Sequence, residues 1–201
     1  MISPDTMSSE KRTYRQRARA ERQADTRRRI AAATAALHEE VGPARTTMAE
    51  IARRAGVQRA TVYANFPEER DLFQACQGHF LAANPPPDLG AAMGTADPGE
   101  RLVAVLTALY GWYRRTRRMS ENLRRDRAGM PALDALLVDS IDARMAGLRD
   151  ALAVGLGEGG SHEVGAAVAV ALDFWTWRRL AEEGLADDHA ATLMAGMVGS
   201  V

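Results

Sequence analysis

Apolar residues recur along the chain at the three- and four-residue spacing of amphipathic helices. A helix over residues 25–40 is predicted by the first such stripe, which consists of Ile30, Ala33, Leu37 and Val41. A Gly-Pro pair follows the stripe and predicts the end of that helix. No stretch alternates apolar and polar residues with the Val, Ile and Thr enrichment of strands. The pattern therefore predicts an all-α fold.

Two short helices are predicted next, over residues 47–55 and 58–65, with a glycine between them. Thr46 or Thr47 can cap the first of them, and Glu50 follows Thr47 at the spacing of a capping box. The glycine permits the left-handed backbone of a sharp turn. Such a braced pair is the helix-turn-helix arrangement, whose second helix enters the major groove of DNA. An ordinary helical corner with the same apolar stripe is the alternative.

Longer helices are predicted in the remainder of the chain. Pro67 opens one of them, residues 84–99 are predicted as a loop, and the four glycines within residues 155–160 predict a flexible turn. With the N-terminal helices, the later ones make about nine in total. These later helices are predicted over residues 99–118, 120–128, 131–154, 161–183 and 187–197.

Charge is distributed unevenly, although the formal net charge is zero. Residues 1–66 contain 13 Lys/Arg and 7 Asp/Glu, whereas residues 67–201 contain 13 and 19. A basic front end on an acidic body is typical of a module that binds a polyanion such as DNA. Residues 1–24 are predicted to be a disordered basic arm, which either lies along phosphates or only keeps the chain in solution.

Cysteine content and hydropathy indicate the compartment. Cys76 is the one cysteine, so no disulfide can form within the chain and a reducing environment is expected. The N-terminus lacks the pattern of a signal peptide, and the longest apolar run, residues 164–172, is about half the length that spans a bilayer. These features predict a cytoplasmic protein.

Catalytic chemistry is not predicted by the sequence. The histidines, at positions 38, 79, 162 and 189, lack the spacing of metal ligands. Neither a Gly-rich phosphate loop nor a nucleophile elbow is present. Neighbouring carboxylates such as Glu182 and Glu183 fit a solvated helix face. We therefore expect neither an enzyme nor a bound metal or cofactor.

Two motifs resemble the DNA-binding region of the TetR/AcrR family of transcriptional regulators. Residues 47–57 read T-x-x-x-I-A-x-x-A-G-V, and residues 61–67 read T-V-Y-x-x-F-P. The resemblance extends from Ile30 to Leu72. It implies a sequence-specific transcriptional regulator, a homodimeric repressor that a small-molecule effector releases from a double-stranded DNA operator. A helix-turn-helix adaptor and a nonspecific nucleic-acid-binding protein, both without effector control, are the alternatives.

The resemblance also implies a division of the chain. After the arm of residues 1–24, a helix-turn-helix DNA-binding domain is expected over residues 25–70. A helical domain for effector binding and dimerisation is expected over residues 71–201.

DNA contacts are assigned by the resemblance to the starts of the two short helices. Thr47 is expected at a phosphate, together with the backbone N–H groups of its helix end. Arg59 is expected to read guanine and Gln58 adenine, while Tyr63 would hydrogen-bond a phosphate. Glu69 departs from the family pattern, because a lysine often stands near that position. The full set of expected contacts is Thr46, Thr47, Gln58, Arg59, Ala60, Thr61, Tyr63 and Asn65.

Methionines and large apolar or aromatic residues in the later helices are candidates for an adaptable cavity that holds the effector. Ordinary core packing is the alternative for each of them. The arginines between positions 114 and 118 are interpreted as a solvated helix end, with contact to an acidic effector as the alternative. The cavity candidates are Leu109, Trp112, Tyr113, Met119, Leu123, Met130 and Phe174.

The helix predicted over residues 161–183 is apolar on two sides, so both sides should be buried. Burial in the centre of one chain is possible, but pairing with a second copy is favoured, with the last helix completing a four-helix interface. The candidates for this interface are Val168, Ala171, Trp175, Met194 and Met197.

Overall fold

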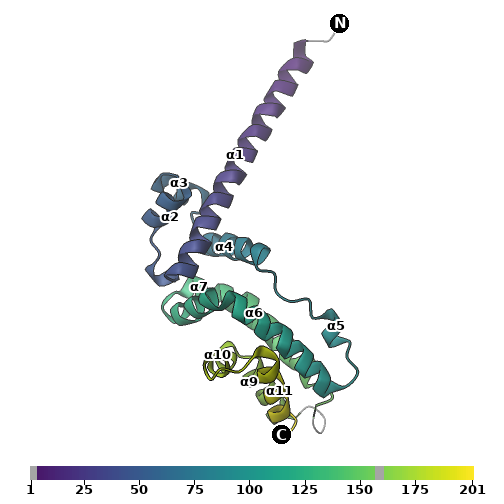
Figure 1. The fold of residues 1–201 in the computed structure, drawn as a ribbon. Helices are drawn as coiled ribbons and strands as arrows, with labels where there is room; N and C mark the ends of the chain where they lie inside the picture. The colour runs from purple at the N-terminus through teal and green to yellow at the C-terminus, as the bar shows by residue number, and fades with distance from the viewer. Residues whose placement is uncertain (1–3, 157–160) are drawn as a thin grey trace. The chain divides into compact units, whose positions relative to one another are not determined.

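The computed structural model describes residues 4–156 and 161–201, and Figure 1 shows their helices as a ribbon. Every regular element within these residues is helical, which confirms the predicted all-α fold. The helices form two compact units; the first ends at Ala83 and the second begins at Asn84. In the part of the chain that is described, no helix is both long and apolar enough to cross a membrane.

The first unit consists of four α-helices and one short turn of 3-10 helix. These are α1 (Pro4–Glu40), η1 (Pro43–Arg45), α2 (Met48–Ala55), α3 (Arg59–Asn65) and α4 (Glu69–Ala83). Helix α1 packs against α2 and α4, and α2 packs against α3. Because α4 packs on α1, this unit continues to Ala83, beyond the domain boundary predicted at residue 70.

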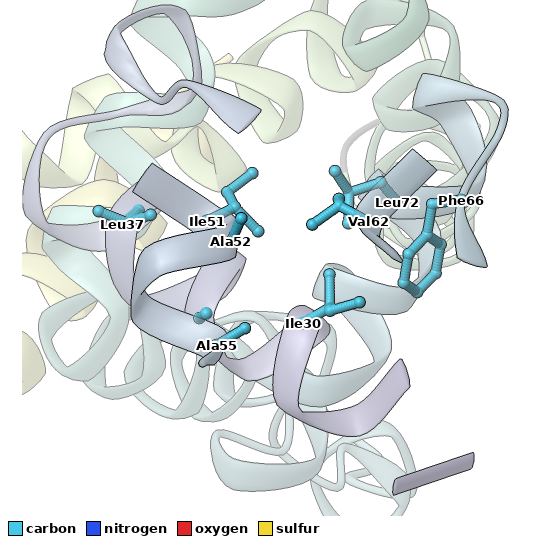
Figure 2. Close-up of a cluster of buried hydrophobic side chains, with 9 residues drawn as sticks. Ile30, Leu37, Ile51, Ala52, Ala55, Val62, Phe66 and Leu72 are labelled. Atoms are coloured by element: carbon cyan, nitrogen blue, oxygen red, sulfur yellow. The ribbon is translucent and has the colours of Figure 1, made fainter. Parts of the chain in front are cut away.

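The apolar stripes of these helices converge in one core, shown in close-up in Figure 2. Ile30 and Leu37 come from α1, Ile51 from α2, Val62 from α3 and Leu72 from α4, and all five are buried. Burying one such side chain contributes about 1.5–3 kcal/mol. This packing holds α3 in place, since a helix of 7 residues is not stable alone. The predicted stripe is confirmed for Ile30, Ala33 and Leu37, whereas Val41 follows the end of α1 and is only half-buried.

Helix α1 begins far earlier than predicted. The sequence predicts an irregular arm through residue 24, but residues 4–24 continue α1 toward the N-terminus, and residues 1–3 lie outside the described part. The difference has a physical cause, because residues 5–41 contain neither glycine nor proline and are rich in Ala, Arg, Glu and Gln. Once α1 is anchored by its buried half, extending it costs little, since each added residue gains a hydrogen bond.

The second unit is arranged around one long central helix, α6. Its elements are α5 (Gly90–Met93), α6 (Pro98–Asp126), η2 (Arg127–Gly129), α7 (Pro131–Leu137), the π-helical turn η3 (Val138–Asp142), α8 (Ala143–Ala153), α9 (His162–Leu172), α10 (Phe174–Glu182) and α11 (Asp187–Val198). Helix α6 packs against α8, α9, α10 and α11. The last helix agrees closely with its prediction.

Several predicted boundaries in the second unit differ from the structure. Helix α6 runs through Met119, where the sequence predicts a break, because Met119 and Ser120 lie on its buried side. The predicted loop of residues 84–99 contains the short α5, and the helix predicted over 131–154 contains the π-helical turn η3. The glycine turn predicted over 155–160 falls mostly outside the described residues.

The helix predicted over residues 161–183 is two helices, because the chain breaks at Asp173 between α9 and α10. The Asp173 carboxylate accepts hydrogen bonds from the N–H groups of Trp175 (2.8 Å) and Thr176 (3.2 Å). These contacts cap α10, whose first N–H groups lack partners within the helix. Asp173, an aspartate within an apolar segment, therefore divides the predicted helix into α9 and α10.

Two tyrosines of α6 complete this break. The Tyr110 hydroxyl donates a hydrogen bond to the carbonyl of Ala171 (2.7 Å), and the Tyr113 hydroxyl donates to the carbonyl of Leu172 (2.8 Å). The last carbonyls of a helix have no partner within it, so the two hydroxyls satisfy the end of α9. Burial raises the pKa of Tyr113 to about 12, so its donating proton stays in place even in alkaline solution.

Candidate nucleic-acid interface

The start of α2 is fixed by a capping box, as predicted. The Thr47 hydroxyl accepts a hydrogen bond from the Glu50 N–H, and the Glu50 carboxylate accepts one from the Thr47 N–H, both at 3.2 Å. The Thr47 hydroxyl also lies 2.9 Å from the Glu50 carboxylate. A phosphate approaching Thr47 would therefore compete with Glu50 for the hydroxyl and the N–H.

Thr46 lies directly before this cap and is half-buried. Its hydroxyl donates a hydrogen bond to the carbonyl of Gly42 at 2.9 Å. Its backbone N–H donates to the carbonyl of Pro43 at 3.0 Å. Both donors of Thr46 are therefore used within the protein, unlike the expectation that they contact a phosphate.

The turn between α2 and α3 depends on Gly56. This residue has φ 65° and ψ 38°, the left-handed conformation that side chains with a Cβ rarely adopt. The Val57 N–H donates to the carbonyl of Ala52 at 3.0 Å, which satisfies an open carbonyl at the end of α2. The glycine turn predicted from the sequence is confirmed, and it sets the direction in which α3 leaves α2.

Helix α3 has one buried side and one exposed side. Val62 is fully buried, and Phe66, which follows the helix, is also buried. The exposed side carries most of the predicted DNA contacts at the start of the helix, namely Gln58, Arg59, Ala60 and Tyr63. Thr61 is half-buried. The side chains that could enter a groove are therefore presented together, on a helix held from behind.

Arg59 and Tyr63 form a pair on this exposed side. The Arg59 guanidinium donates a hydrogen bond to the Tyr63 hydroxyl at 3.2 Å, and it lies 5.6 Å from the centre of the Tyr63 ring. The residues are four apart, so their side chains meet on one face of the helix. The pair brings a positive charge and a phenol to one place, which suits contact with a base edge and an adjacent phosphate.

Asn65, the last residue of α3, is placed differently from the other candidates. Its side-chain amide donates to the carbonyl of Thr61 at 2.8 Å, and its Oδ1 atom is buried. Its own carbonyl accepts a hydrogen bond from the guanidinium of Arg27. Asn65 is thus directed toward the protein, which argues against its predicted role at DNA.

Arg27 is a positioning residue that the sequence reasoning missed. In addition to the Asn65 contact, its guanidinium lies 4.1 Å from the centre of the Phe66 ring. It therefore ties α1 to the end of α3 by a hydrogen bond and a cation–π contact. Its spacing in the sequence could have indicated this role, because Arg27 precedes Ile30 by three residues and so lies on the buried side of α1.

A cavity of about 380 Å³ lies within the second unit. Of the predicted cavity residues, Tyr113 and Phe174 line it. Leu109, Trp112 and Met119 are instead buried in the core of the unit. Leu123 and Met130 are half-buried, but they do not line this cavity. The sequence reasoning also missed Arg124, which lines the cavity from α6.

The predicted interface residues do not share one surface. Trp175 and Met197 are exposed, with 48% and 56% of their surface accessible. Val168, Ala171 and Met194 are buried within the second unit, which corrects their assignment to an outer interface. The reason is that α9 packs against α8 and α11 of the same chain, so its apolar side is already covered.

Comparison with known proteins agrees with this reading of the first unit. Residues 30–76 match the family described as bacterial regulatory proteins, tetR family. An uncharacterized HTH-type transcriptional regulator of Mycobacterium bovis is 45% identical over 60 residues, which cover 30% of this chain and 32% of that protein. One from Mycobacterium tuberculosis is 51% identical over 49 residues, covering 24% and 26%. The chain thus matches about a third or less of each relative's length.

Solved structures agree over more of the chain, and they bear on the fold alone. A TetR-like transcriptional regulator from Rhodococcus sp. RHA1 has a TM-score of 0.59 at 20% identity, covering 86% of this chain and 93% of that one. A second transcriptional regulator from the same organism has a TM-score of 0.60 at 22% identity, covering 86% and 95%. Residues 30–76 are thus similar to the tetR family of bacterial regulatory proteins, and the chain as a whole has the all-helical fold of these solved structures.

Proposed function

We propose that this protein is a sequence-specific transcriptional regulator, a repressor that a small-molecule effector releases from its DNA operator. The observation that carries the proposal is the exposed start of α3 on a buried and capped framework. Gln58, Arg59 and Tyr63 are exposed, while Val62 anchors the helix from behind. The tetR-type match over residues 30–76 supports the same assignment.

We assign a separate role to each exposed side chain of α3. Arg59 reads guanine through two parallel hydrogen bonds, and Gln58 reads adenine. Tyr63 contacts a phosphate and, through its hydrogen bond, also orients Arg59. The start of α2 at Thr47 lies against the DNA backbone once a phosphate replaces the Glu50 carboxylate at the Thr47 N–H.

A homodimer is part of the proposal, because two recognition helices about 34–36 Å apart can occupy successive turns of one DNA groove. The support for it is a set of exposed apolar side chains on α9, α10 and α11, which a second copy would cover. These side chains are Val170, Trp175, Leu193 and Met197. The operator would then have two related half-sites. Acting on DNA in a bacterium, the protein would work in the cytoplasm.

Selection of preferred sequences from a random DNA pool tests the proposal directly. A specific regulator should enrich a two-part motif and bind it about a thousandfold or more tightly than random DNA at physiological salt. Affinity should be measured at several salt concentrations, because the nonspecific part depends strongly on salt.

A selection without a preferred motif would contradict the proposal. Enrichment of no motif, with equal affinity for all sequences, would favour a nonspecific nucleic-acid-binding protein over a regulator. The exposed α3 would then contribute charge without reading bases.

A further inference from the structure

The cavity lined by Tyr113 and Phe174 also contains an arginine, Arg124, that forms no close ion pair with the described residues. Arg124, Arg127 and Arg149 all line the cavity. Arg127 pairs with two carboxylates, at 2.6 and 2.7 Å, and Arg149 pairs with one at 2.7 Å. Arg124 makes no hydrogen bond or ion pair with any described residue. Its N–H donors are therefore open to an acceptor that enters the cavity.

The surroundings of Arg124 are aromatic. Its guanidinium lies 4.6 Å from the centre of the Phe174 ring and 5.9 Å from the centre of the Tyr113 ring. Burial lowers the pKa of Arg124, although a guanidinium remains charged at neutral pH. Arg124 is half-buried and its nearest carboxylates do not form an ion pair with it, so an anion that entered the cavity would interact favourably with its charge.

Two acidic residues also line the cavity, and both have other partners. Asp142 pairs with Arg127 at 2.7 Å. Asp173 accepts the first N–H groups of α10. Neither carboxylate forms an ion pair with Arg124, but their charges would disfavour a ligand with several negative charges. Together, the arginine and the two carboxylates favour a ligand with a single negative charge.

The remaining walls define the body of that ligand. The cavity, at about 380 Å³, is within the range of small-molecule sites, which extends from about 300 to 1,000 Å³. A planar ring can stack in such a space, while the edge of the guanidinium, which the aromatic contacts do not use, offers paired N–H donors. The apolar walls are Ile141, Met145, Ala146, Ala169, Leu172 and Trp175.

We propose that this cavity binds a small aromatic carboxylate, with its carboxylate on Arg124 and its ring among the apolar side chains. A carboxylate matches the guanidinium edge with two parallel hydrogen bonds. The claim that this ligand is the effector rests on the proposed function. The claim that the cavity binds such a ligand depends only on the cavity and its residues.

Calorimetric titration of the full chain, without DNA, tests the site. The probes are 1-naphthoate and its neutral analogue 1-naphthamide, which have nearly the same shape and differ in charge. Naphthoate should bind with a Kd of about 1 mM or tighter, and at least about tenfold more tightly than the amide. Equal binding of the two probes, or no binding of naphthoate, would overturn the inference.

Substitution of Arg124 locates the effect. Arg124→Gln should remove the preference for naphthoate, and Arg124→Lys, which keeps the charge but not the paired donors, should retain part of it. Arg118→Gln, on an exposed position of the same helix, is the matched control and should bind as the original protein does. Circular dichroism establishes that each variant is folded. A folded Arg124→Gln variant with an unchanged preference would refute the role of Arg124.

Operator binding separates this inference from the proposed function. If naphthoate binds through Arg124 and the operator affinity stays unchanged, the site is supported and effector control by this ligand class is refuted. If the operator is bound specifically but naphthoate is not, the regulator is supported and the site is refuted.

Discussion

At the scale of single residues, the DNA-facing surface depends on contacts that exist before DNA is bound. The Arg59 guanidinium already has a partner in the Tyr63 hydroxyl, so its position on α3 is restricted. A side chain that is held near its binding position loses less conformational entropy when it binds. Arg59 and Tyr63 should therefore act together, yet each should leave its own signature in binding data.

Replacing Arg59 should relax sequence recognition. We expect Arg59→Ala to weaken operator binding by about 1–3 kcal/mol and to remove the preference at one base position of each half-site, because a base contact is lost. Tyr63→Phe is the matched variant. It keeps the ring but removes the hydroxyl, so it should weaken binding on every sequence and reduce the preference at the Arg59 position less than Arg59→Ala does. Competition binding with single-base operator variants distinguishes the two, and a uniform loss for Arg59→Ala would make Arg59 a phosphate contact.

The left-handed conformation of Gly56 should be costly to reproduce with any other residue. Gly56→Ala is expected to destabilise the first unit by about 1–2 kcal/mol, although space is available for the added Cβ. Gly78→Ala, in α4, is the control because its φ is not positive and nothing lies within 4 Å of the added Cβ. That variant should be neutral or up to about 1 kcal/mol more stable. Urea unfolding measures both, and equal effects would contradict the argument.

At the scale of helices, the sequence predicts some features well and others not. The stripe from Ile30 to Leu37 and the glycine turn at Gly56 could be predicted because they depend on residues close in sequence. The break at Asp173 could not, because the carbonyls it opens are satisfied by tyrosines of α6 about sixty residues earlier. Arg124 could not be recognised from the sequence. Its position along α6 indicates which side of the helix it lies on, but not that the rings of Tyr113 and Phe174 lie beside it.

Three helices of the second unit are joined by one carboxylate, that of Asp187 at the start of α11. It accepts hydrogen bonds from Arg114 of α6 at 2.7 and 2.8 Å and from the indole N–H of Trp177 in α10 at 3.0 Å. Burial alone would raise the pKa of Asp187, but the hydrogen bonds outweigh it, so the pKa is lowered. A carboxyl whose pKa is lower in the folded state stabilises that state only where it is ionised.

This carboxylate should make the second unit sensitive to acid. The stability that Asp187 contributes is complete above its unfolded pKa of about 3.9 and is lost as the pH falls through the lower, folded value. We expect Asp187→Asn to reduce stability by about 1–3 kcal/mol at pH 7, and by less at pH 3. The exposed neighbour Asp188, replaced by Asn, is the control. Melting temperatures across this range measure the effect, and a constant difference between original protein and variant would contradict it.

At the scale of the whole molecule, the proposed homodimer can be tested by charging its surface. Leu193 and Met197 are both exposed and lie one turn apart on α11. Glutamates at both positions should convert a dimer to a monomer, because burying two carboxylates without partners is unfavourable. Analytical ultracentrifugation measures this, with Ala128→Glu, at an exposed position of η2, as the control. A double variant that stays dimeric would place the interface elsewhere.

The break at Asp173 has a consequence for what the cavity can accept. A continuous helix bends only by stretching its internal hydrogen bonds, whereas α9 and α10 are joined by one residue with extended backbone, at φ −71° and ψ 136°. Leu172 and Phe174, on either side of this joint, both face the cavity. A small pivot of α10 would widen or narrow the space while the tyrosine hydroxyls hold the end of α9. Carboxylates with rings of different size should then compete for the same cavity.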